Sequence, residues 1–116
     1  MPKKLDLARF QKSRESQVDA GAFGFTIRRP SALDVARAGA AGGGITIEYA
    51  CKYVVGWSRV NESDLIPVGD PEPLEFDSAL LFAWVSDRPE LWQPIVTGVI
   101  NSFRAYEEAS EDRGNV

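Results

Sequence analysis

The chain has 116 residues, 44% hydrophobic and 26% charged, a composition typical of a single soluble globular domain. No apolar run approaches the roughly 20 residues of a membrane span, and the start lacks the apolar stretch of a secretory signal, so we expect a cytoplasmic protein that does not contact a membrane. Histidine is absent and Cys51 is the single cysteine, which excludes imidazole-based triads, zinc sites of cysteine and histidine, and disulfides within the chain.

Charge is distributed unevenly along the chain. Up to Arg37 there are 8 Lys/Arg and 4 Asp/Glu, a net charge of +4. From Ala38 onward there are 5 Lys/Arg and 13 Asp/Glu, a net charge of -8. The molecule therefore has a basic head and an acidic body. This asymmetry is compatible with a solvated surface, with nucleic-acid contact by the basic end, or with head-to-tail association between copies.

The first third of the chain predicts an arm, a strand and a helix. Residues 1–22 are polar with weak periodicity, so we predict a basic N-terminal arm that is mobile or partly helical. In Phe23–Arg28 apolar and other residues alternate, which predicts a short strand that Pro30 ends. Ser31 and Asp34 form a helix-capping pattern, and the glycines at 42–44 are a stop signal, so a helix is predicted over Ala32–Ala41.

The remainder predicts three more helices. One covers about Thr46–Ser58, apolar on nearly all sides, with "VVGW" at its end, and a proline-rich loop follows. Phe76 and Asp77 resemble a staple and cap for a helix over Ser78–Ser86, and "DRPE" starts a last helix that runs to about Ser110 with a kink at Pro94. The predicted fold is mainly α: about four helices with a short N-terminal strand or hairpin, in one compact domain over 23–110, with an acidic flexible tail at 111–116.

Reactive motifs are weak throughout the chain. The glycine-rich "GAAGGG" lacks the lysine and hydroxyl of a phosphate-binding loop, and the acidic loop 61–72 lacks the glycine of a calcium loop. Cys51 lies within an apolar run, which indicates a buried thiol. We therefore predict no enzyme, no cofactor and no metal; the enzymatic alternative is a carboxylate-dependent hydrolase, which would need a divalent metal ion. The other alternative is a small nucleic-acid-binding regulator, which would bind phosphates through basic residues of the first third of the chain. These residues are Lys3, Lys4, Arg9, Lys12, Arg14, Arg28 and Arg29.

Three segments, in order, carry a family resemblance: "FTIRRPSALDVARA", "YVVGWSRV" and "PLEFDSALLFAWVSDRPELWQPIVTGVINSF". Together they resemble the tail assembly chaperones of long-tailed bacteriophages and their prophages, from about Phe23 to Phe103. The resemblance implies a protein without enzymatic activity that keeps the tape measure protein soluble and brings tail-tube subunits to it. Residues 1–22 have no counterpart in the resemblance.

The predicted helices carry more apolar surface than a domain of this size readily hides. We therefore predict that part of it binds an aggregation-prone helical partner, and that copies of the chain associate with one another. Neither nucleic acid nor a membrane is expected as a partner. The candidate partner-binding residues lie on the second, third and fourth predicted helices: Trp57, Leu81, Phe82, Val85 and Trp92.

Overall fold

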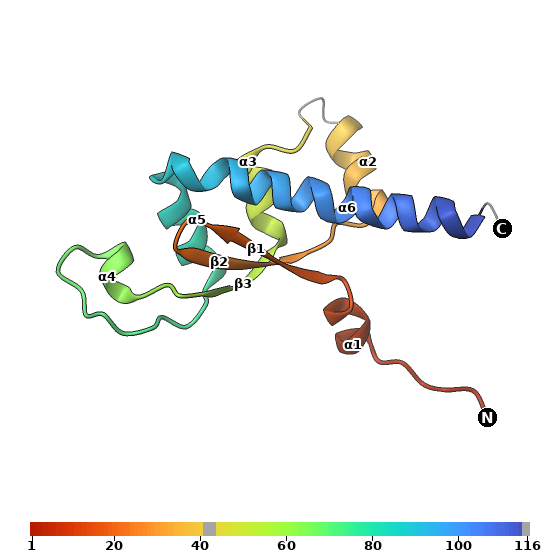
Figure 1. Ribbon diagram of the computed structural model, residues 1–116, viewed down its shortest axis with the longest axis horizontal. Helices are drawn as coiled ribbons and strands as arrows, with labels where there is room; N and C mark the ends of the chain where they lie inside the picture. The colour runs from red at the N-terminus through yellow and green to blue at the C-terminus, as the bar shows by residue number, and fades with distance from the viewer. Residues whose placement is uncertain (41–43, 115–116) are drawn as a thin grey trace.

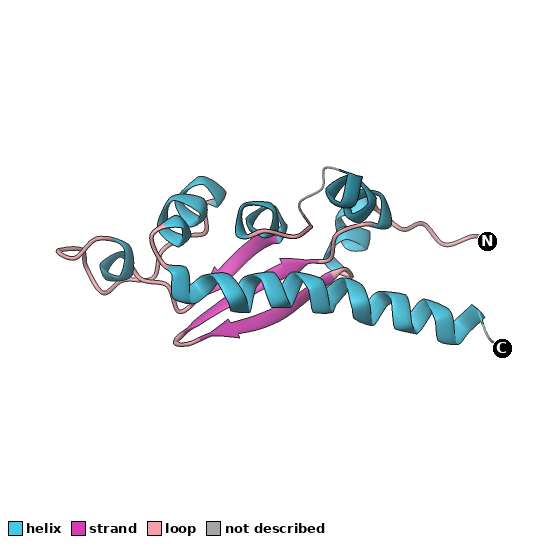
Figure 2. Ribbon diagram, turned by 90° about the horizontal axis from the view of Figure 1, so that it is seen from above, coloured by secondary structure: helices cyan, strands magenta, loops and turns pink. Residues whose placement is uncertain are grey.

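The computed structural model describes residues 1–40 and 44–114 and has a three-stranded antiparallel sheet in the order β1-β2-β3. Helices α3, α5 and α6 supply most of the rest of the core, and α6 runs across the sheet (Figures 1 and 2). The fold is therefore mixed α and β in a single domain. The prediction of a mainly α fold with a short N-terminal strand or hairpin is wrong about the size of the sheet, because a third strand joins the hairpin. In chain order the elements are α1 Leu7–Lys12, β1 Glu15–Ala20, β2 Phe23–Arg28, α2 Ala32–Ala40, α3 Ile47–Ala50, η1 Cys51–Tyr53, β3 Val54–Ser58, α4 Glu62–Leu65, α5 Ser78–Ser86, η2 Pro89–Leu91 and α6 Trp92–Gly114.

The N-terminal residues contribute a strand to the sheet. β2 has the predicted bounds, but β1 pairs with it along its whole length, from Glu15 opposite Arg28 to Ala20 opposite Phe23. A two-residue turn joins the strands, and its Gly21 adopts φ +61°, which glycine reaches without strain. Residues 15–20 are thus an ordered strand rather than part of a mobile arm. Only Val18 and Ala20 of β1 pack into the core, which is why the rest of the strand can be polar.

The predicted helix over Thr46–Ser58 is wrong beyond its first turns. Thr46 caps α3, its hydroxyl accepting the Tyr49 N–H at 3.2 Å, but the chain then passes through η1 into β3. β3 pairs with β2, placing Trp57 opposite Phe25. Valine and tryptophan favour strands, and an apolar run of this length is compatible with either a buried helix or a strand. The segment "VVGW" is therefore part of the central sheet rather than the end of a helix.

The other helices follow their predicted signals. Ser31 and Asp34 form the reciprocal capping pair of α2, although Ala41 at its predicted end lies outside the described residues. The Asp77 carboxylate accepts the Leu80 N–H at 3.0 Å and starts α5 at the predicted residue. The last helix begins with the turn at Pro89 and extends to Gly114, beyond the predicted end at Ser110. Pro94 is the third residue of α6. A backbone N–H at this position would have no acceptor within the helix, so proline, which lacks the N–H, costs no hydrogen bond and α6 continues through it.

Trp84 connects α5 to the sheet. Its ring meets Phe23 edge-on at a centroid distance of 5.0 Å and Trp57 at 6.1 Å, and it lies 6.4 Å from Phe25. Leu81 and Val85, on the same side of α5, are fully buried. From α6 the core receives Ile95 and Val99, one helical turn apart.

Replacing Trp84 tests this packing. Trp84→Ala should lower the free energy of unfolding by about 3–5 kcal/mol, because it leaves a cavity among aromatic rings. Trp84→Phe should cost only about 1–2 kcal/mol, because the indole Nε1 has no hydrogen-bond partner among the described residues and no bond is lost. Urea unfolding of the two variants measures the difference, and equal losses would contradict this account.

A close contact between α6 and β1 makes a second prediction. A Cβ atom at Gly98 would lie 2.6 Å from the Val18 Cγ2 atom, so Gly98→Ala should destabilise the fold by about 1–3 kcal/mol despite the better helix propensity of alanine. In a Val18→Ala background the clash is absent, and the same substitution should stabilise by about 0.5–1 kcal/mol. Thermal or urea unfolding of the wild type, the two single variants and the double variant shows whether the effect of Gly98→Ala on stability changes sign.

Candidate partner-binding surface

Helix α5 has one buried and one exposed side, although nearly all its residues are apolar. The buried side carries Leu81, Trp84 and Val85. The opposite side is solvent-exposed, and we call it the α5 face; it consists of Ala79, Leu80, Phe82 and Ala83. Leu80 is 45% exposed and Phe82 46%, and they flank the two alanines. This pattern is a shallow strip of small side chains between two larger apolar ones.

A groove of about 450 Å³ lies on the Leu80 side of the α5 face. The segment around α4 forms its far wall, held by backbone hydrogen bonds from Ser63 N–H to the Asp70 carbonyl (2.9 Å) and from Leu74 N–H to the Val60 carbonyl (2.9 Å). We call it the α4–α5 groove; its lining residues are Glu62, Asp64, Leu65, Ile66, Leu74, Leu80, Ala83, Trp84, Asp87 and Arg88. Apolar side chains are therefore accompanied by three carboxylates and one guanidinium.

A second groove, of about 480 Å³, lies on the Phe82 side, between α5 and the segment that leads into β3. Its lining includes Phe82, Lys52 and the edge of Cys51. Cys51 is buried, as predicted, and burial raises the pKa of its thiol. The thiol therefore stays protonated at neutral pH, which suits a packing role better than a nucleophilic one.

The structure separates the five predicted partner-binding residues into three groups. Leu81 and Val85 have no exposed surface and belong to the core, so they are not available to a partner in this conformation. Trp57 is half-buried: its indole packs edge-on against Phe76 and donates to the Leu74 carbonyl at 2.8 Å. Phe82 lies on the α5 face. Trp92, 36% exposed, lies at the end of α5, where its indole donates to the Val85 carbonyl at 2.6 Å.

Sequence reasoning missed two exposed apolar residues of this surface. Leu80 lies on the α5 face, and Ile66, 49% exposed, lies across the α4–α5 groove from it. The Asp77 cap fixes where α5 begins, but it does not fix which side of an all-apolar helix faces the sheet. Ile66 lay in a segment predicted as a loop, which the structure shows to contain α4.

The basic residues do not form one open patch. The Arg14 guanidinium donates to the Arg29 carbonyl at 2.8 Å, and Arg28 lies 3.7 Å from the Glu15 carboxylate. Arg29 stacks on the Tyr106 ring at 3.7 Å, and its pKa is lowered by burial and by the nearby Arg14. These three arginines make contacts within the chain. The other four basic residues are in α1 and the segment before it: Lys3, Lys4, Arg9 and Lys12.

Within 1–40 and 44–114, no three Cys, Asp or Glu side chains are grouped so that they would hold a metal ion. In the same part of the chain, no helix is long and apolar enough to cross a lipid bilayer.

Comparisons with protein-family models, with curated proteins and with solved structures found no match for this chain. The resemblance to tail assembly chaperones therefore stays a prediction. The exposed apolar α5 face, with a groove on each side, is the surface best suited to hold a partner.

The buried thiol of Cys51 and the partly buried Tyr53 predict how stability changes at alkaline pH. The Tyr53 hydroxyl donates to the Tyr49 hydroxyl at 3.0 Å, and burial together with this bond raises the pKa of Tyr53. Cys51 and Tyr53 thus keep their protons in the folded chain at pH values where the unfolded chain loses them. The free energy of unfolding should fall as the pH rises above about 8.5, the ordinary value for cysteine, and fall more steeply above about 10, the ordinary value for tyrosine.

Urea unfolding between about pH 7 and 11 measures this dependence. Tyr53→Phe should flatten the decline above about pH 10, and Cys51→Ala should flatten the part between about pH 8.5 and 10. A stability that rises over this range would contradict the two pKa shifts.

Proposed function

We propose that this protein is a tail assembly chaperone of a long-tailed bacteriophage or prophage. It acts without catalysis, binds the tape measure protein to keep it soluble, and helps to bring tail-tube subunits to it. The observation that carries the proposal is the α5 face, which exposes Leu80 and Phe82 beside two grooves in the segment where the family resemblance is longest.

The chemistry of the α5 face suits an apolar helix as the ligand. Helices bind to apolar surfaces by area and shape, with larger side chains entering hollows on either side of the contact. Here Ala79 and Ala83 allow a partner helix to approach closely, and the α4–α5 groove offers room for its side chains. A long helical protein with repeated apolar faces, such as a tape measure protein, presents this kind of ligand.

Charge supports the same role. The chain from Ala38 onward carries a net charge of -8, and Glu62, Asp64 and Asp87 line the α4–α5 groove. Carboxylates around an apolar contact keep a complex soluble and repel other acidic surfaces. Arg88 is the exception in the groove lining, and it also contacts Glu90.

Co-expression with the tape measure protein of the same phage genome tests the proposal. The wild-type chain should raise the soluble fraction of the tape measure protein and be recovered with it by pull-down. Leu80→Asp and Phe82→Asp should each weaken the complex by about tenfold or more, because each places a charge within an apolar contact. Leu33→Asp is the matched control, because Leu33 is a 58% exposed helical residue on α2, away from the α5 face.

Two outcomes count against the proposal. Equal insolubility of the tape measure protein with and without this chain, and no recovered complex, would end the chaperone function. If Leu33→Asp weakened the complex as much as Leu80→Asp, binding would not depend on the α5 face.

A further inference from the structure

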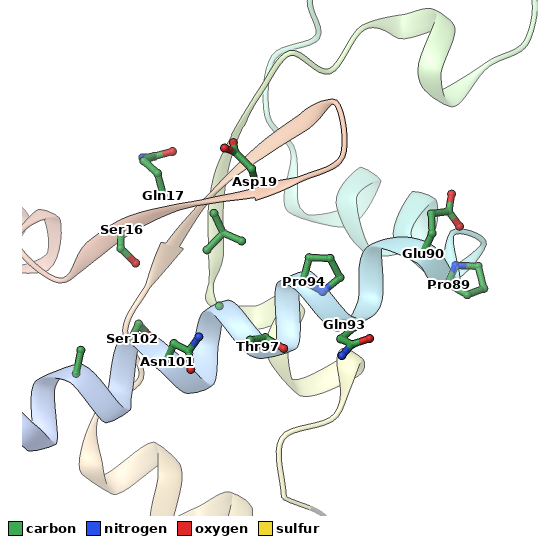
Figure 3. A pocket seen from close by; sticks show the side chains of 13 residues that line it. Ser16, Gln17, Asp19, Pro89, Glu90, Gln93, Pro94, Thr97, Asn101 and Ser102 are labelled. Atoms are coloured by element: carbon green, nitrogen blue, oxygen red, sulfur yellow. The ribbon is translucent and has the colours of Figure 1, made fainter.

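A groove of about 810 Å³ runs between β1 and α6, on the molecule's exposed sheet edge (Figure 3). The consecutive residues 16–19 of β1 line one wall, so the groove follows the edge of the strand rather than one of its faces. The other wall is one side of α6 and the turn before it, from Pro89 to Ala105. We call this the β1–α6 groove.

The backbone of β1 offers hydrogen bonds toward this groove. The Arg29 N–H donates to the Arg14 carbonyl at 2.8 Å, which fixes the alternation of the antiparallel ladder. Every second residue of β1 therefore exchanges backbone hydrogen bonds with β2, namely Ser16, Val18 and Ala20. The residues between them direct their N–H and C=O groups away from β2, namely Glu15, Gln17 and Asp19. In the described part of the chain the sheet has no strand beyond β1. The edge therefore has the geometry for one more strand.

The dimensions of the groove match a short extended segment. Six residues of β1 span about 20 Å, and α6 from Pro94 to Ala105 spans about 17 Å. Five or six residues of an added strand would fill that length.

The charges of the groove favour a basic occupant. Asp19 lies on the strand wall and Glu90 on the helix wall, and no lysine or arginine is among the lining residues. Asp19 pairs with Arg59 at 2.6 Å and Glu90 with Arg88, but both pairs lie at the surface, where such contacts contribute little. An added strand with positive side chains on both faces would complement the two walls.

The N-terminal segment of the chain has these properties. Residues 1–5 have no helix or strand, are exposed, and lead away from the body (Figure 1). They carry the consecutive Lys3 and Lys4, whose side chains would point to opposite sides of a strand. Leu5, 58% exposed, is an apolar side chain without a place in the core.

We propose that residues 1–5 of one copy add as a strand to β1 in the β1–α6 groove of a second copy. Each copy has one such segment and one groove, so every contact joins two different surfaces, and copies can be linked in a row or by reciprocal exchange of their segments. This surface is separate from the α5 face, and the inference does not rest on the proposed function.

Sedimentation of the purified full-length chain, without any partner, tests the association. The weight-average mass of the wild type should rise steadily with concentration and fall with added salt. Lys3→Glu/Lys4→Glu and Asp19→Lys/Glu90→Lys should each lower the association constant by about tenfold or more, because each places like charges opposite one another. Mixing the two variants should restore association, since the acidic segment of one then meets the basic groove of the other.

Two further variants separate strand addition from general charge attraction. Arg9→Glu/Lys12→Glu changes the net charge by the same amount as the Lys3/Lys4 variant but acts on α1, and it should leave association unchanged. Gln17→Pro removes an N–H that points into the groove. It leaves the backbone hydrogen bonds between β1 and β2 in place and removes only the exposed side-chain bond to Thr26, so it should weaken association with an unchanged circular dichroism spectrum.

Three results would overturn the inference. The first is a wild-type chain that stays monomeric at every concentration. The second is an equal loss in the Arg9/Lys12 and Lys3/Lys4 variants. The third is a folded Gln17→Pro chain that associates like the wild type.

Discussion

The packing of Trp84 against the sheet is the interaction on which the other helix contacts depend. Its indole meets Phe23 and Phe25 of β2 and Trp57 of β3, so it needs both strands in register before it has a complete set of neighbours. Sheet pairing and the docking of α5 are therefore one cooperative event. The turn at Pro89 follows directly and brings the first turns of α6 over the same core.

This constraint also decides which apolar residues remain at the surface. An all-apolar helix in a small domain has to turn one side outward, because the sheet covers only the other. With Trp84 facing the sheet, Leu81 and Val85 are buried beside it, and Leu80 and Phe82 are exposed. The same packing thus stabilises the fold and creates the surface proposed to hold a helical partner.

The sheet contributes a second kind of surface through its edge. The outer side of β1 is polar, as in the hydrogen bond between Gln17 and Thr26, so this face of the sheet needs no cover. No strand of the described residues pairs with this edge of β1 beside α6, and Gly98 allows the helix to approach Val18 closely. Acidic side chains at this edge and basic ones at residues 3 and 4 place opposite charges at two separate sites on the same chain.

The sequence by itself determined the features that depend on local chemistry. The caps at Ser31 and Asp77 and the turn at Pro89 placed α2, α5 and α6, and the alternation in Phe23–Arg28 placed β2. Each of these signals works through hydrogen bonds or periodicity within a few residues. For the candidate surface, the sequence indicated surplus apolar area on α5, and it identified Phe82 and Trp92 among the exposed residues.

Only the tertiary structure decided the rest, because those features depend on neighbours distant in the chain. The polar β1 becomes a strand because β2 lies beside it, and "VVGW" becomes β3 because its side chains fill the space between β2 and α5. An apolar run does not specify helix or strand when both would be buried. Likewise, periodicity cannot orient a helix that is apolar all round, so the exposure of Leu80 and the burial of Leu81 follow from the position of Trp84 against the sheet.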